Sequence, residues 1–163
     1  MVILIIGIMA SVVIVNMPDM DSMRITQAAY KIQSDIRFAQ RLAMQLQRRT
    51  AIIFVAASDS YLIFTENTYG LYDWVWAKDP LTQELFYVQL NSDEFQGVDI
   101  TTVLFNSPNY WLAFDRNGDP YGIQPPSTAT ALSDNAYVIL NTNQKYIVVK
   151  QGTGWVNVQD TAP

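Results

Sequence analysis

Residues 24–56 read RITQAAYKIQSDIRFAQRLAMQLQRRTAIIFVA, and the hydrophobic period changes inside this stretch. Before Arg49, apolar residues alternate in spacings of four and three, which places them on one face of a helix. This stripe consists of Ile25, Ala29, Ile32, Ile36, Ala39, Ala43 and Leu46. After Arg49 the period becomes two, the repeat of a β-strand. We therefore predict an amphipathic helical stem over 24–50 and a globular antiparallel β domain over 51–163.

Short period-2 segments bounded by turn residues continue through the β domain. The predicted strands are Ala51–Ala56, Tyr61–Thr65, Leu71–Ala77, Leu85–Leu90, Val98–Phe105, Tyr110–Asp115, Ala136–Leu140, Lys145–Lys150 and Trp155–Val158. The last three follow one another through short turns and are expected to form an antiparallel meander, whereas 125–134 reads as a polar loop. The predicted fold class is α+β, with a long N-terminal helix packed on an antiparallel β-sheet or a two-sheet β-sandwich.

Ahead of the stem, residues 1–17 read MVILIIGIMASVVIVNM and carry no charge. A helix of this length spans about 25 Å, slightly short of the roughly 20 residues that cross a membrane. A secretory signal would have a basic start and a small-residue cleavage site, and a buried core helix would usually have a polar stripe. We expect residues 1–23 to form a hydrophobic helix that anchors the chain in a membrane, with Pro18 tolerated near the membrane boundary.

Charge is distributed unevenly along the chain. The net charge is −5. Residues 18–50 have six basic and three acidic residues, a net charge of +3. Residues 51–163 have four basic and twelve acidic residues, a net charge of −8. An acidic domain repels phosphate backbones, so no nucleic acid is expected as a partner. The chain has no cysteine and no histidine, which excludes disulfides, Ser-His and Cys-His nucleophile pairs and the commonest metal ligand. We expect a protein that is not an enzyme.

The helical stripe has two interpretations. It can pack on the chain's own sheet, which we expect for its C-terminal half, or it can form a coiled coil with other chains. The coiled-coil interpretation lacks paired charges beside the seam and has only three to four heptad repeats.

Several segments, taken in order, resemble one protein family. Ile5-Ile6-Gly7-Ile8 and the residues after it are similar to the N-terminal helix of type IV pilins and type II secretion pseudopilins. Three further segments resemble H-type minor pseudopilins and FimT-like minor pilins, namely Asp35–Ala43 with Arg49–Phe54, Leu112–Pro120, and Gly152–Val156.

The resemblance implies a structural subunit of a type IV pilus-like or type II secretion pseudopilus filament. The N-terminal helix would sit in the bacterial inner membrane as a single pass, with the β domain extracytoplasmic, and would move into the core of a cell-surface or periplasmic filament. Implied partners are copies of the chain, other pilin-like subunits and assembly platform proteins. The implied assembly residues are Ile5, Ile6, Gly7, Ile8, Pro18, Ile25, Ile32 and Ile36.

The chain also departs from the family pattern. Family members begin with a basic leader, a glycine cleavage site, an aromatic residue and a glutamate, none of which is present before Ile5. We expect that about seven residues of the mature helix precede Met1 in the gene, because of an internal start codon or a cut sequence. FimT-like DNA-uptake pilins carry arginines near the C-terminus, whereas 155–163 has no basic residue, so a DNA-binding role does not carry over.

Two motifs in the β domain could bind ligands. Asp115, Asn117 and Asp119 place oxygen atoms at alternate positions, as calcium loops do, but the glycine and glutamate of an EF-hand are missing. The alternative is a hairpin turn at Asn117-Gly118, and no cofactor other than a possible calcium ion is expected.

Tyr72, Trp74 and Trp76 share one face of a predicted strand and could stack on sugars, although such a stripe is more often a wall of the core. The alternative function is therefore a membrane-anchored extracytoplasmic binding module that uses this aromatic face for a glycan or a protein.

Overall fold

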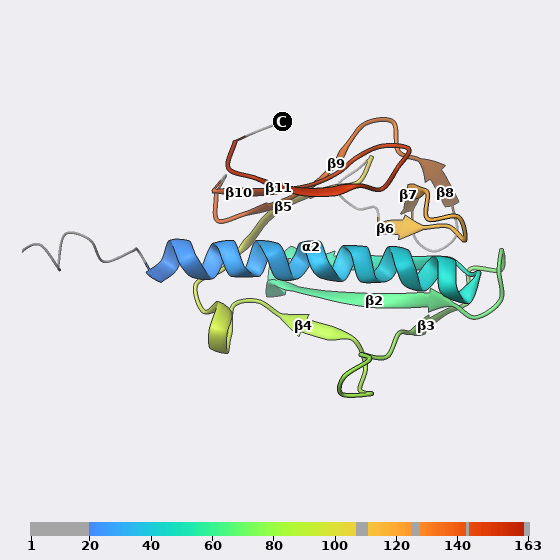
Figure 1. Cartoon of the computed structure of the whole chain (residues 1–163), viewed down its shortest axis with the longest axis horizontal. Helices are drawn as coiled ribbons and strands as arrows, with labels where there is room; N and C mark the ends of the chain where they lie inside the picture. The colour runs from blue at the N-terminus through green and yellow to red at the C-terminus, as the bar shows by residue number, and fades with distance from the viewer. Residues whose placement is uncertain (1–19, 107–110, 125–127, 143, 162–163) are drawn as a thin grey trace, which may run out of the picture.

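The computed structural model describes residues 20–106, 111–124, 128–142 and 144–161. In these ranges one long helix, α2 (Met20–Leu46), packs against two antiparallel sheets (Figure 1). The predicted α+β class and the antiparallel pairing are confirmed, and of the two predicted arrangements the chain adopts the one with two sheets.

The larger sheet has seven strands in the described residues, in the order β3-β2-β1-β6-β7-β8, with β4 also paired to β2. They are β1 (Thr50–Val55), β2 (Ser60–Glu66), β3 (Trp74–Trp76), β4 (Tyr87–Gln89), β6 (Trp111–Phe114), β7 (Pro120–Gln124) and β8 (Thr128–Ala131). The smaller sheet has the order β11-β10-β9-β5 and consists of β5 (Ile100–Leu104), β9 (Ala136–Leu140), β10 (Lys145–Val149) and β11 (Val156–Gln159). Two short 3₁₀ helices, η1 (Ala56–Ser58) and η2 (Asp93–Phe95), connect strands.

The predicted meander at the C-terminal end is confirmed as β9-β10-β11. Two predictions about the strands are wrong. The segment predicted as Leu71–Ala77 forms a strand only from Trp74, because Tyr72 has a φ of +56° and leaves the extended conformation. The segment 125–134, predicted as a polar loop, contains β8, which pairs with β7. The residues of β8 are exposed Thr and Ala, so the sequence shows no alternation of hydrophobic and polar residues there.

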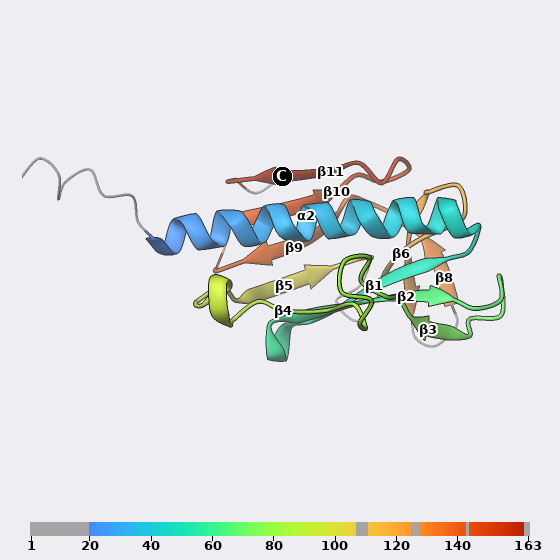
Figure 2. The same ribbon diagram turned by 60° about the horizontal axis from the view of Figure 1, so that its bottom comes forward.

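Helix α2 lies between the two sheets, as the two views show (Figures 1 and 2). Six residues of the predicted stripe, from Ile25 to Ala43, are at most 3% exposed, whereas Leu46 is 43% exposed. The stripe therefore packs inside its own chain along both its halves, and its alanines allow the helix to approach the sheets closely. Side chains from the helix and from both sheets form one continuous hydrophobic core.

The turn from helix to sheet is fixed by backbone geometry. Gln47 takes a left-handed conformation with a φ of +54°, and the Arg48 N–H donates to the Ala43 carbonyl at 3.2 Å. This six-to-one bond is the hallmark of a Schellman motif, which ends a helix and reverses the chain. Strand β1 can therefore begin at Thr50, three residues after the left-handed position.

A polar row on α2 fastens the helix to the loops and to edge strand β11. The Gln33 and Arg37 side chains both donate to the Val156 carbonyl, at 3.0 and 2.8 Å. One turn further, the Gln40 amide donates to the Gly118 carbonyl at 2.8 Å and to the Thr153 carbonyl at 3.1 Å. These bonds satisfy carbonyls at the ends of two hairpins and set the position of the helix along its axis.

We predict that Gly154→Ala destabilises the fold more than Gly152→Ala. Both glycines have positive φ, +65° and +75°, so each substitution costs about 1–2 kcal/mol of backbone strain. An added Cβ at Gly154 would lie 2.6 Å from Gln40 Nε2 and 2.9 Å from the Phe114 ring, whereas at Gly152 it meets nothing within 4 Å. The extra crowding should cost a further ~1–3 kcal/mol in urea unfolding. Equal losses from the two substitutions would contradict the packing described at Gln40.

Candidate functional site

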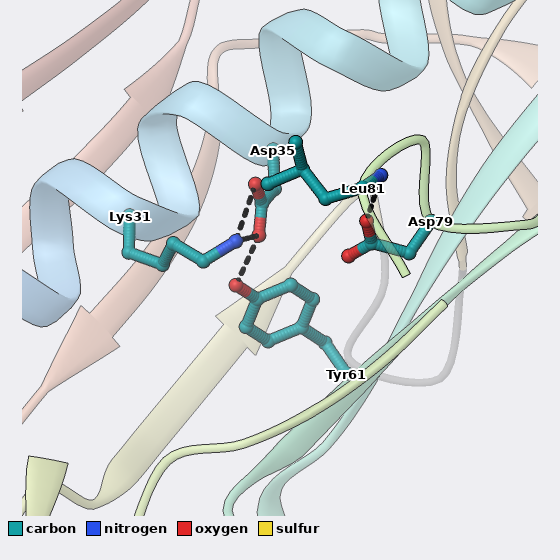
Figure 3. Close-up of polar contacts among 5 residues, drawn as sticks. All are labelled: Lys31, Asp35, Tyr61, Asp79 and Leu81. Atoms are coloured by element: carbon teal, nitrogen blue, oxygen red, sulfur yellow. Dashed lines mark hydrogen bonds and ion pairs between the residues drawn. The ribbon is translucent and has the colours of Figure 1, made fainter. Parts of the chain in front are cut away.

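A buried carboxylate joins the helix to the larger sheet (Figure 3). The Asp35 side chain, on α2, accepts two bonds from Lys31 Nζ at 2.9 and 2.7 Å and one from the Tyr61 hydroxyl of β2 at 2.5 Å. Asp35 is 6% exposed and Tyr61 is fully buried. We name Lys31, Asp35 and Tyr61 the helix clamp.

Burial raises the pKa of the Asp35 carboxyl above its ordinary value, because a buried charge loses hydration. The bonds from Lys31 and Tyr61 oppose this rise, and the negative charge of Asp79 adds to it. Asp79 lies in the neighbouring loop, where its carboxylate accepts the Leu81 N–H at 2.7 Å (Figure 3). Burial also raises the pKa of Tyr61 well above its ordinary value, so its hydroxyl stays protonated and donates.

The helix clamp is a structural device rather than a reactive centre. Both partners of the Asp35 carboxylate hold it in place, so the network positions α2 against β2. Asp35 is not among the site residues predicted from the sequence, although one signal of its role is present there. Asp35 directly precedes Ile36 and stands four residues before Ala39, which puts a charge at the margin of the apolar stripe.

A second polar cluster lies on the face of the larger sheet that α2 does not cover. Arg49, at the start of β1, contacts the fully buried carboxylate of Glu66, at the end of β2, with 3.5 Å between Nη1 and Oε1. The Glu66 N–H donates to the Arg49 carbonyl at 2.8 Å, and Glu66 Oε1 accepts the Tyr72 N–H at 2.7 Å. Strand pairing therefore brings together two charges that are 17 residues apart in the sequence.

Three tyrosine rings surround the Arg49 guanidinium. Its central carbon lies 4.8 Å from the ring centres of Tyr69 and Tyr72 and 5.9 Å from that of Tyr121. A planar guanidinium stacks well on aromatic faces, which hold it in one orientation. We name Arg49, Glu66, Tyr69, Tyr72 and Tyr121 the Arg49 corner.

Buried polar atoms of the Arg49 corner are not fully satisfied. Arg49 Nη1, Glu66 Oε2 and the Tyr121 hydroxyl are buried and form no hydrogen bond with any described residue, and the same holds for the Trp74 indole N–H beside them. Such an atom costs about 1–3 kcal/mol when nothing bonds it. Unsatisfied buried groups are rare in folded proteins, so their concentration sets the corner apart from the rest of the described structure.

A cavity of about 260 Å³ opens beside the corner. Its lining residues are Arg49, Tyr69, Asp115, Asp119, Pro120, Tyr121, Ala129, Thr130 and Ala131. Nothing in the local sequence marks this cavity, because its walls come from strands β7 and β8, from the segments that follow β2 and β6, and from Arg49 just before β1.

The predicted assembly residues fall into two groups. Ile5, Ile6, Gly7, Ile8 and Pro18 lie outside the described residues. Ile25, Ile32 and Ile36 are at most 3% exposed and belong to the core of their own chain. In this structure the second group stabilises the fold of its own chain and is not on its surface.

The predicted calcium motif forms the turn between β6 and β7. The Asp115 carboxylate accepts the N–H groups of Asn117 and Asp119, at 2.8 and 3.0 Å, and Gly118 has a φ of +88°. This is the hairpin turn that we gave as the alternative, and Asp115 serves it by capping backbone groups. Across the part of the chain that the structure describes, no group of three acidic residues is placed to hold a metal ion. Calcium binding by Asp115, Asn117 and Asp119 stays a prediction.

The three residues of the predicted ligand face take separate positions. Tyr72 lies outside β3 and stacks on Arg49. Of the three residues predicted to share one face of a strand, only Trp74 and Trp76 do so. Trp74 is half-buried, with its ring edge-on to Trp111 at 6.1 Å, while Trp76 stays 43% exposed beside Phe64 at 4.6 Å.

No protein family model, curated protein or solved structure matches this chain. The pilin-like resemblance therefore stays a prediction. In the described ranges, no helix is both long enough and apolar enough to cross a membrane.

We predict that part of the pH dependence of stability comes from Asp35. The pKa of this carboxyl is higher in the folded chain than its unfolded value near 3.9, so folding favours its protonated form. The corresponding stability is fully present below pH ~4 and is lost as the pH rises through the folded pKa. In urea unfolding from pH 3 to 7, wild type should lose stability relative to Asp35→Asn as the pH rises.

Tyr61→Phe provides the matched comparison. It keeps the carboxyl but removes a donor that lowers its pKa, so the decline with pH should become steeper than in wild type. Parallel pH profiles for wild type, Asp35→Asn and Tyr61→Phe would show that Asp35 does not titrate in this way.

Proposed function

We propose that this chain is a structural subunit of a type IV pilus-like or type II secretion pseudopilus filament. Residues 1–23 anchor it in the bacterial inner membrane before assembly and then pack against copies of themselves or other pilin-like subunits in the filament core. The β domain lies outside the membrane and on the outside of the filament. Assembly platform proteins drive the transfer from membrane to filament.

The observation that supports this proposal is the position of the N-terminal end of α2. Its first turns project beyond both sheets (Figures 1 and 2). Met20 is 64% exposed and Met23 is 45% exposed. In the sequence, the uncharged segment 1–17 comes just before these turns, whose exposed methionines add apolar surface at the projecting end of the helix.

Charge adds a second support. Arg41 is exposed on α2 and Arg48 is exposed just after its end, whereas the residues after Arg49 have a net charge of −8. Attraction between the basic helix of one subunit and the acidic domain of the next would favour ordered stacking and would weaken with salt.

We predict that the purified full-length chain forms filaments once detergent is removed, as seen by negative-stain electron microscopy. Ile8→Lys and Met23→Glu should each reduce pelleted filament at least about tenfold, because each would bury an unpaired charge between subunits. Gln45→Glu changes an exposed side chain near the far end of the same helix and should assemble normally. Single particles from wild type, or normal assembly of both variants, would reject the proposal.

A second candidate function is a membrane-anchored extracytoplasmic binding module for a glycan or a protein. The observation that favours it is the uncovered face of the larger sheet. One cross-strand row runs from Trp76 through Phe64 to Ala51 and Ala113, and the small residues leave room for the aromatic rings around them. Trp76 remains 43% exposed at the edge of this face.

We predict that Trp76→Ala weakens binding of the full-length chain to glycans on an array by about three- to tenfold, the loss expected for one aromatic stacking contact. Trp155→Ala removes another exposed tryptophan, which directly precedes β11 of the smaller sheet, and should leave binding unchanged. Equal binding by both variants would exclude Trp76 from the ligand surface.

A further inference from the structure

We propose that the cavity beside the Arg49 corner is a binding site for a small, uncharged, polyhydroxylated ligand, a single sugar residue of a glycan. This proposal rests on the second candidate function, the binding of a glycan. It places the glycan in the cavity rather than on Trp76, which does not line it. In this proposal Arg49, Asp119 and the edge strand β8 contact the sugar.

The site is preorganised by the contacts that fix Arg49. The guanidinium is stacked among Tyr69, Tyr72 and Tyr121 and is held by the buried Glu66 carboxylate. It therefore needs no ordering when a ligand arrives, which reduces the entropic cost of binding. The guanidinium has five N–H donors, and Arg49 lines the cavity, so the donors that do not face Glu66 are the ones a ligand there can use.

The charges around the cavity select for a neutral ligand. Two carboxylates, Asp115 and Asp119, line the same space as Arg49. A second guanidinium, Arg116, lies 5.1 Å from the ring centre of Tyr69. Two negative and two positive groups balance, so the repulsion of an anion by the carboxylates, or of a cation by the guanidinium groups, offsets the attraction from the opposite pair. Hydroxyl groups avoid both penalties, because a hydroxyl donates to a carboxylate and accepts from a guanidinium.

The remaining walls suit the ring of a sugar. Pro120, Ala129, Ala131 and the Tyr121 ring provide apolar surface, and the Thr130 hydroxyl adds one more polar group. The volume of about 260 Å³ lies just below the range of roughly 300–1,000 Å³ for drug-sized ligands, so the cavity fits one small unit rather than a long chain.

The test measures binding of glucose, galactose, mannose, N-acetylglucosamine and N-acetylgalactosamine to the full-length chain in detergent by saturation-transfer NMR. At least one should bind with a dissociation constant on the order of 1 mM, as expected for a ligand of this size. Ala129→Phe fills the cavity from an exposed position and should weaken binding more than about tenfold, as should Asp119→Asn.

Matched controls are Ala57→Phe and Asp134→Asn, which make the same changes at exposed positions away from the cavity and should bind like wild type. Filament formation by Ala129→Phe should equal that of wild type, which separates this site from subunit assembly.

Two comparison ligands test the charge argument. Inorganic phosphate and the neutral amide N-acetylglycinamide should not compete with the sugar. Tight binding of either one, with no sugar bound, would overturn the assignment to a polyhydroxylated ligand.

Other outcomes separate the two binding proposals. If a sugar binds and Trp76→Ala abolishes the signal while Ala129→Phe does not, the aromatic face is the ligand surface and the cavity assignment fails. If no sugar binds to wild type, both the cavity assignment and the glycan form of the second candidate function fail.

Discussion

The whole structure depends on burial of one helical stripe between two sheets. The residues of α2 from Ile25 to Ala43 that face inward are almost completely removed from solvent and share one core with both sheets. Burial of apolar surface contributes about 25 cal/mol per Å², and α2 contacts strands β1 and β6 of the larger sheet and β10 and β11 of the smaller one. The alanines at positions 29, 39 and 43 set the short distance at which the helix and the strands meet.

Polar contacts then determine where the helix lies along this groove. The helix clamp joins α2 to β2 through Asp35, and Gln33, Arg37 and Gln40 join it to the β10–β11 and β6–β7 regions. A stripe of Ile and Ala alone would tolerate a shift by one turn, since the same residue types recur. Directional bonds from fixed side chains remove this freedom. The projecting end of α2, on which the filament proposal rests, is a consequence of that fixed position.

Sequence and structure differ most on the outer face of the larger sheet. Period-2 alternation correctly placed Trp74 and Trp76 on one side of a strand, but it could not show that Tyr72 turns away through a positive φ. It also missed β7 and β8, and the Thr and Ala residues of β8 carry no hydrophobic signal and gain their strand conformation from pairing with β7. These two deviations created the features of greatest interest, because Tyr72 helps to hold Arg49 and β8 forms a wall of the cavity.

The sequence by itself determined the helix, most of the strands, the α+β class and the C-terminal meander, because each follows from a local period of hydrophobic residues and from turn chemistry. It also determined the uneven charge and the lack of histidine and cysteine. Only the tertiary structure decided that the stripe faces its own sheets, that Asp35 is buried, and that Arg49 meets Glu66 and three tyrosines. Those contacts join residues far apart in the chain, and a local pattern carries no information about which distant strand will lie beside it.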